Sequence, residues 1–190
     1  MKIAFVAFIA AILLSSCGSI PPLNFSVPNV GVSNKKIDAE MKSMTITIAR
    51  PDEKTGALPA GMENNVPQLW QTALTESLNR MVIFRDDAAM KVNLSVKILK
   101  LEVPGGGFSM TTNAAARYEL IDRNTGGIIF AQDISSSGTT PADFAFAGIA
   151  RIRESINRAV QNNITQFLQA LETVDVKKPM FPAKGKGANE

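Results

Sequence analysis

The side chains that could carry chemistry in this chain are notable for the types that are missing. The 190 residues include no histidine and a single cysteine, Cys17. Ser-His and Cys-His nucleophile pairs need an imidazole, and the common structural zinc sites need several cysteines or histidines. The composition therefore excludes these classes of hydrolase and metal site, and we expect neither a cofactor nor a bound metal.

The remaining candidates for catalysis are hydroxyl and carboxyl side chains. They are Ser135, Ser136, Ser137, Thr139 and Thr140, which lie near Asp133 and Asp143, and the adjacent pair Asp86 and Asp87. Small hydroxyl residues before a helix usually serve as caps and turn residues, and adjacent carboxylates rarely face each other across a substrate. We therefore predict that the protein is not an enzyme, with an acyltransferase as the least favoured alternative.

Cys17 stands at the end of an export-signal pattern. A positive start at Lys2 is followed by the apolar run Ile3 to Leu14, which is shorter than the about 20 residues needed to span a membrane. Leu14-Ser15-Ser16-Cys17 resembles the lipobox of bacterial lipoproteins. The resemblance implies that the thiol of Cys17 is diacylglycerated and that cleavage makes Cys17 the mature N-terminus. The alternative is a buried cysteine after a signal peptide that is cut elsewhere.

Lipidation would determine the compartment, because two or three acyl chains hold a protein on a bilayer essentially permanently. By resemblance to lipoprotein sorting in double-membrane bacteria, Gly18 and Ser19 favour the periplasmic face of the outer membrane, with retention at the inner membrane as the alternative. The chain carries 20 Lys and Arg against 17 Asp and Glu, with no basic cluster typical of a nucleic-acid surface. We therefore expect a membrane partner and no nucleic acid.

The composition divides the chain into four parts. We expect a lipoprotein signal peptide over 1–16, a flexible lipid-anchored tether over 17–42, one α+β domain over 43–172 and a disordered basic tail over 173–190. Prolines and small polar residues without sustained periodicity predict the tether. Phe25 and Val27 could instead belong to a short edge strand interrupted at Pro28, which would start the domain earlier.

Hydrophobic periodicity predicts the elements of the domain. Alternation predicts strands over 44–48, 90–103, 114–120 and 128–134, and a change of phase at Ile98-Leu99 predicts a bulge. Three- and four-residue spacing predicts helices over 67–80 and from the apparent cap at Thr140 to Glu172, with a brief apolar run over 82–84. The fold class is α+β, an antiparallel sheet of about four to five strands with two helices packed on one face, in the order β-α-β-β-β-β-α.

Two aromatic residues are candidates for binding. Trp70 lies on the apolar stripe of the first predicted helix, where an ordinary core aromatic is the favoured interpretation. The glycine-rich loop 105–110 offers Phe108 and Met110, which could meet a lipid tail or a partner protein. The alternative of equal weight is that Phe108 folds back on the sheet.

The domain resembles the auxiliary lipoproteins of ABC-type lipid transport over roughly Met44 to Leu171. The segments that carry the resemblance are Leu69-Trp70-Gln71-Thr72-Ala73-Leu74, Val92 to Leu101, Tyr118-Glu119-Leu120-Ile121-Asp122 with Thr125-Gly126, and Ala145 to Leu171. Lipopolysaccharide-assembly lipoproteins share a similar plan of sheet and helices. The first resemblance implies an anchored adaptor that helps envelope machinery to move lipid. The alternative is a structural or chaperone-like lipoprotein for the assembly of an outer-membrane protein complex.

Overall fold

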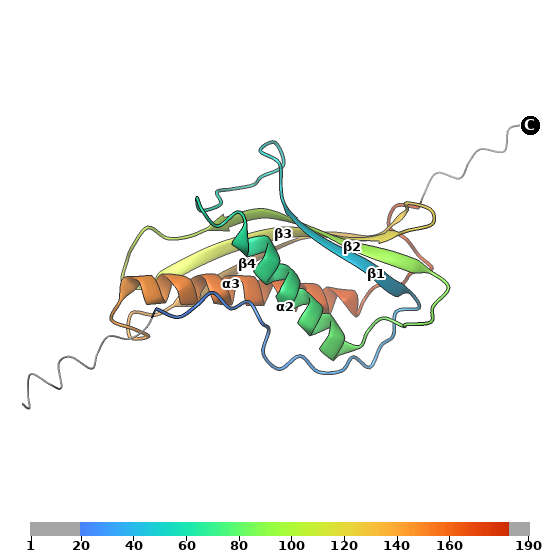
Figure 1. Cartoon of the computed structure of the whole chain (residues 1–190), viewed down its shortest axis with the longest axis horizontal. Coiled ribbons are helices and arrows are strands. Elements are labelled where there is room, and N and C mark those ends of the chain that lie inside the picture. Colours follow the sequence, from blue (N-terminus) through green and yellow to red (C-terminus); the bar gives the residue numbers. More distant parts are fainter. Residues whose placement is uncertain (1–19, 183–190) are drawn as a thin grey trace, which may run out of the picture.

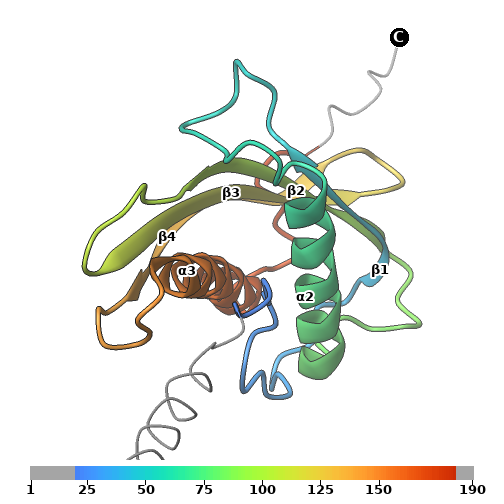
Figure 2. The same ribbon diagram turned by 60° about the vertical axis from the view of Figure 1, so that its left-hand side comes forward.

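One four-stranded sheet, covered on one face by two helices, forms the body of the molecule (Figure 1). The computed structural model describes residues 20–182. The strands lie across the sheet in the order β1 (Glu40–Ile48), β2 (Lys91–Glu102), β3 (Met110–Asp122) and β4 (Ile128–Thr140), and the helices are α2 (Asn65–Met81) and α3 (Gly148–Leu171). The predicted fold class, α+β with two helices on one face, is confirmed (Figure 2).

The sheet is mixed, whereas we expected an antiparallel one. β1 pairs in parallel with β2, while β2 with β3 and β3 with β4 are antiparallel. The reason is the connection, because α2 carries the chain back along the sheet before β2 begins and so returns it in the same direction. The order is β-α-β-β-β-α, since the apolar run 82–84 forms only an isolated bridge between Phe84 and Ile37.

The predicted bulge in β2 is confirmed. Pairing with β3 shifts register between Ile98 and Lys100, so that both Ile98 and the next residue, Leu99, are buried. Leu99 forms a small second cluster with Ala49 and Ala115, separate from the main core. The bulge thus gives the end of β2 a buried residue on each side of the sheet.

The boundary between β4 and α3 is not where the sequence pattern placed it. We expected a helix cap at Thr140, but Thr140 is fully buried and pairs with Met110 as the last residue of β4. Residues 141–147 then form a loop, and α3 begins at Gly148. A sheet partner for Thr140 excludes the exposed position that a helix cap requires, so the prediction was wrong here.

Gly138 allows α3 to lie directly on β4. A Cβ atom at this position would lie 2.5 Å from the carbonyl oxygen of Ser155 and 2.7 Å from the carbonyl carbon of Arg158. Both are backbone atoms of α3, which cannot move aside as a side chain can. The close approach is reinforced by Ser136, whose hydroxyl donates a 2.8 Å hydrogen bond to the carbonyl of Ala159.

The described part of the expected tether, residues 20–42, is packed into the fold instead. Phe25 and Val27 are buried in the main core, and the segment runs between α2 and α3 (Figure 2). The backbone N–H of Asn24 donates a 2.8 Å hydrogen bond to Asn157 of α3. The structure therefore differs from a flexible tether, because these few apolar side chains fill the space that the two helices leave between them.

The described start of the expected tail, residues 173–182, also lies against the fold. Val174 is buried, and Phe181 exchanges two 2.9 Å backbone hydrogen bonds with Ile128 at the beginning of β4. The lysines of this segment do not prevent the pairing, because the hydrogen bonds are between backbone groups. Residues 183–190 lie outside the described part.

A buried network of polar side chains joins the two helices to the sheet. Trp70 of α2 donates from Nε1 to the hydroxyl of Tyr118 at 3.2 Å, and this hydroxyl donates to Oδ1 of Asn163 at 2.9 Å. Asn163 of α3 in turn donates to the carbonyl of Ile134 at 2.8 Å. Burial raises the pKa of the Tyr118 phenol, so it stays a neutral donor. The ring of Tyr118 stacks on Phe167 with centroids 4.1 Å apart.

Candidate functional site

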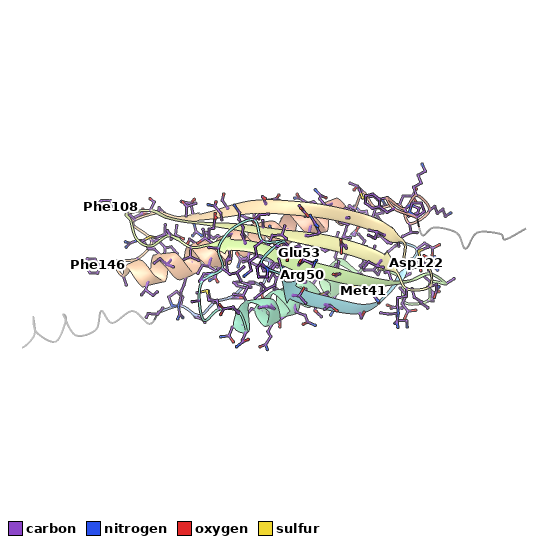
Figure 3. All side chains as sticks on the ribbon, turned by 90° about the horizontal axis from the view of Figure 1, so that it is seen from above. Met41, Arg50, Glu53, Phe108, Asp122 and Phe146 are labelled. Carbon is purple, nitrogen blue, oxygen red and sulfur yellow. The ribbon has the colours of Figure 1, made fainter. Side chains whose placement is uncertain are left out.

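Large apolar side chains are exposed together at one end of the molecule. They come from the β2–β3 loop, from the loop that leads from β4 into α3, and from the first turn of α3. We call this region the aromatic end; it comprises Phe108, Phe144, Phe146 and Ile149. Phe108 is 89% exposed and Phe146 is fully exposed, and Figure 3 shows both at the same extremity. Large apolar groups that are exposed together are typical of an interaction site.

Arg151 connects the two loops of the aromatic end. Its Nη1 donates to the carbonyls of Ala145 at 2.6 Å and Phe146 at 3.0 Å, and its Nη2 donates to the carbonyl of Gly107 at 3.4 Å. Gly107 has a φ of +143°, a backbone conformation that favours glycine and that turns the chain just before Phe108. The two phenylalanines are thus carried on backbone that one arginine holds together.

Phe144 is the least projecting aromatic residue of this group. Its ring lies under the guanidinium of Arg158, 5.5 Å from the ring centroid, and it is 45% exposed. Arg158 is fixed by Glu154, which accepts from its Nε at 2.7 Å, and by the carbonyl of Thr139 at 2.9 Å. A cation over an aromatic face is attractive, so Phe144 is held along α3 and Phe146 alone points away from this loop.

The described chain begins beside the aromatic end. The carbonyl of Pro21 accepts a 3.2 Å hydrogen bond from Arg153, in the second turn of α3, and the side chain of Ile20 is 48% exposed. In Figure 1 the first described residues, in blue, run beside the part of α3 that is next to the aromatic end. Cys17, the predicted lipidation site, lies outside the described residues.

The structure separates the two predicted binding residues of the glycine-rich loop. Phe108 projects into solvent and does not fold back on the sheet. Met110 is only 2% exposed because it opens β3 opposite Thr140 and points into the core. Exposure therefore agrees with the expectation at Phe108 and contradicts it at Met110, while binding at either residue stays a prediction.

Sequence reasoning missed Phe144, Phe146 and Ile149 as surface residues. Ile149 falls within the helix that we predicted from Thr140 to Glu172 and fits its three- and four-residue spacing, but it is 44% exposed. The signal that could have identified them is the two-residue spacing of Phe144 and Phe146, which does not fit the helical stripe that starts at Ile152. The apparent cap at Thr140 concealed this mismatch by extending the helix over them.

The candidate catalytic groups are dispersed. Ser136 faces α3, whereas Asp133 lies on the opposite face of the sheet, where it pairs with Arg117 at 2.6 and 2.8 Å. Thr139 contacts Thr111 at 3.0 Å, and Asp87 pairs with Arg85. The structure does not bring these groups together around a shared space. That the protein is not an enzyme stays a prediction.

The other face of the sheet carries charged pairs. Arg117 lowers the pKa of Asp133, chiefly by hydrogen bonding, and Asp133 raises the pKa of Arg117 in return. Lys97 donates to Glu53 at 2.6 Å, and this bond together with the backbone N–H of Arg50 lowers the pKa of Glu53 to about 2. These pairs make this face a solvated polar surface, in contrast to the aromatic end.

Hollows in the surface lie mainly around the helices. One of about 200 Å³ separates residues 28–31 from the last turns of α3 and is lined in part by Val27, Met81 and Leu168. Another of about 680 Å³ lies along polar side chains of α2 such as Gln71 and Glu76. The apolar hollow is below the about 300 Å³ at which ligand pockets usually begin. A third hollow, of about 520 Å³, lies between Pro22, Leu69 and Arg153. The two larger hollows are open to solvent and have linings of mixed polarity.

Neither α2 nor α3 is both long and apolar enough to cross a bilayer, and residues 20–182 contain no other helix that is. In the same part of the chain, no three acidic or cysteine side chains gather closely enough to hold a metal ion.

The sequence matches no protein-family model and no curated protein. Among solved structures, a Xanthomonas campestris protein of the DUF330 family shares 8% identity, with 80% of this chain and 97% of that chain covered and a TM-score of 0.45. A minor lipoprotein from Acinetobacter baumannii shares 9% identity, covering 69% and 92%, with a TM-score of 0.39. Lipoprotein GNA1162 from Neisseria meningitidis shares 10%, covering 70% and 94%, with a TM-score of 0.36.

Several of the structures that the chain resembles are thus bacterial lipoproteins. Similarities as weak as these do not assign the chain to a family.

Proposed function

We propose that the chain is a lipid-anchored adaptor of the bacterial cell envelope, held by Cys17 at the periplasmic face of the outer membrane, where it assists a lipid-transport apparatus. The lipobox Leu14-Ser15-Ser16-Cys17 supports the anchor. The observation that carries the proposal is the placement of Ile20, three residues after Cys17, beside an end of the fold with exposed phenylalanines. An anchored module with such an end is suited to recognition.

An adaptor is favoured over a lipid carrier by the way the helices are packed. Much of the space between α2 and α3 is filled by the chain itself, with Phe25 edge-on to Trp70 at a centroid distance of 6.3 Å. A carrier needs an apolar cavity for acyl chains. Here the apolar side chains of α2 and α3 that face each other pack against residues 20–39 instead.

The anchor is tested by labelling cells with radioactive palmitate. We expect label on the wild-type protein in the membrane fraction and loss of both label and membrane attachment in Cys17→Ser. The matched control combines Cys17→Ser with Ser109→Cys. It again has one cysteine, now outside the lipobox, and should stay unlabelled. Label that persists in Cys17→Ser would refute the anchor.

The adaptor role is tested by cross-linking the membrane-attached protein in intact cells. Recovery of a membrane ATPase, a permease or a membrane-anchored substrate-binding protein would support lipid transport. Recovery of a porin-like outer-membrane protein without those partners would favour the alternative, a structural or chaperone-like lipoprotein. Stoichiometric lipid bound to the protein in addition to its anchor would contradict the adaptor and favour a carrier.

A further inference from the structure

We propose that the aromatic end inserts into the headgroup region of the same bilayer that holds the lipid anchor, so that the protein has a second, non-covalent membrane contact. This inference rests on the proposed function, because it takes Cys17 to be acylated. Three observations carry it: the exposure of the phenylalanines, the place where the chain reaches the anchor, and the charge around that place.

Exposure identifies the surface. Phe108 and Phe146 are 89% and 105% exposed, although each comes from a different loop, and Arg151 holds the two loops together through the carbonyls of Gly107 and Phe146. Two projecting aromatic rings on linked loops form a small apolar tip. Phenylalanine is one of the residues that peripheral proteins bury at the boundary of headgroups and acyl chains.

The position of the anchor indicates that the surface contacted by the aromatic end is the bilayer. Three residues of fully extended chain span at most about 11 Å, so the acylated sulfur of Cys17 must lie close to Ile20. Pro21 is bonded to Arg153, which lies about 7.5 Å along the helix axis from Gly148, the first residue of α3. A bilayer that holds Cys17 is therefore within reach of the aromatic end, whatever protein partners are present.

Charge around the aromatic end suits phosphate headgroups. Arg151 and Arg153 lie in the first two turns of α3, and within residues 20–182 neither forms an ion pair, since both donate to backbone carbonyls. Arg158 is paired with Glu154, and Asp143 is the exposed carboxylate of the preceding loop. Guanidinium groups bind phosphate oxygens well and are attracted to anionic leaflets.

The opposite end of the molecule has a polar turn, beside which Met180 and Phe181 pair with the start of β4 and are 55% and 60% exposed. The turn between β3 and β4 consists of polar residues, where Thr125 donates to Asp122 at 2.8 Å and Asn124 is exposed. Figure 3 shows Asp122 far from Phe108 and Phe146. This turn is the natural internal control, since a bilayer contact at the aromatic end leaves it in water.

The test uses acylated full-length protein, purified from bacterial membranes and placed in vesicles of phosphatidylethanolamine and phosphatidylglycerol. Because Cys17 is the only cysteine, Ser109→Cys and Asn124→Cys each introduce a single reactive thiol for an environment-sensitive dye. Quenching is measured with nitroxide-labelled lipids and with aqueous iodide. We expect most of the emission at position 109 to be lost to the lipid quencher, and position 124 to be quenched by iodide alone.

A second variant separates insertion from mere proximity to the anchor. Phe108→Ser and Phe146→Ser, combined with the dye at position 109, should lose the lipid quenching and gain iodide quenching. Equal lipid quenching with and without the phenylalanines would overturn the inference, as would its absence in both. A dye at position 109 that is shielded from both quenchers would show that a second copy covers this end, which also overturns it.

Failure of the proposed function would be recognised separately. The wild-type protein is treated with the same thiol-reactive dye before any variant is studied. Labelling of Cys17 in the purified protein would show that the thiol is not acylated and would refute the anchor itself. A blocked Cys17 together with an unquenched position 109 would refute only insertion of the aromatic end.

Discussion

Aromatic side chains gather in two regions of this molecule with opposite exposure. In the interior, Trp70 and Tyr118 are fully buried, and their polar atoms are linked to each other and to Asn163. At the aromatic end, Phe108 and Phe146 project from loops and carry no polar atom that needs a partner. In the interior pair, hydrogen bonds offset the cost of removing polar atoms from water. In the exposed pair, the apolar ring surface stays available for contact with another surface.

The difference teaches how the chain divides its aromatic residues between stability and recognition. Rings on the regular elements α2 and β3 hold the helices on the sheet. Rings on the connecting loops contribute little to that packing, so their substitution should alter contacts outside the fold. Stability measurements on the two regions test this division directly.

The largest expected effect comes from Trp70→Ala. Removing a fully buried indole should lower the free energy of unfolding by about 3–5 kcal/mol, since it leaves a cavity beside Phe25 and Tyr118. Urea denaturation followed by circular dichroism measures the change. The matched control is Phe146→Ala at the aromatic end, which should shift the free energy by less than about 0.5 kcal/mol. Similar losses in the two variants would break the comparison.

The next effect concerns the contact that holds α3 on the sheet. Gly138→Ala places a methyl group against the backbone of Ser155 and Arg158 and should cost about 3 kcal/mol, because the helix must shift as a unit. Thermal unfolding measures this cost. Gly105→Ala is the control, because its Cβ would point into open space near Phe108. Unchanged stability of Gly138→Ala would show that α3 can move freely on β4.

A smaller effect is expected from Tyr118→Phe, which keeps the ring and removes its hydroxyl. Trp70 Nε1 and Asn163 Oδ1 then lose their shared partner, which should cost about 2 kcal/mol. Thr111→Val removes an exposed hydroxyl pair with Thr139 and should have a much smaller effect. Chemical denaturation compares the two. Equal effects would mean that the buried network is worth no more than a surface contact.

The smallest effect belongs to the polar face of the sheet. Asp133→Asn should lower stability by about 0.2–1 kcal/mol at pH 7, because the pair with Arg117 is half exposed. The folded-state pKa of Asp133 is lowered from its ordinary 3.8, so wild type has this advantage above pH 3.8 and loses it as the pH falls through the lower folded value. Urea denaturation across pH 2–7 should show the two curves converging in acid.

Much of the regular structure could be predicted because its periodicity is local. The alternation in β2 and its break at Ile98 follow from residues that are neighbours in the chain, as does the stripe of α2 that buries Trp70. The parallel direction of β1 could not be predicted, because it depends on where α2 returns the chain. The inclusion of Phe25 in the domain could be offered only as an alternative, because its ring partner Trp70 lies 45 residues away and its neighbours include prolines.

The candidate site was predicted only in part for a similar reason. Three glycines before Phe108 indicate an exposed loop from local sequence alone. Phe146 could be recognised as a surface residue only from the structure, in which α3 begins at Gly148, because the pattern Thr140-Pro141 imitates a helix start. Met110 belongs to the same glycine-rich segment but is buried, because it pairs across the sheet with Thr140, and this distant pairing could not be predicted from local sequence.

The packing of residues 20–39 between the helices affects the order in which the chain folds. Asn24 is hydrogen-bonded to Asn157, 133 residues later. The first residues of the domain to be synthesised can therefore reach their final packing only after α3 has been synthesised. Such distant pairings slow folding and leave apolar groups uncovered in the meantime. We therefore expect Phe25 to stay uncovered until α3 is complete.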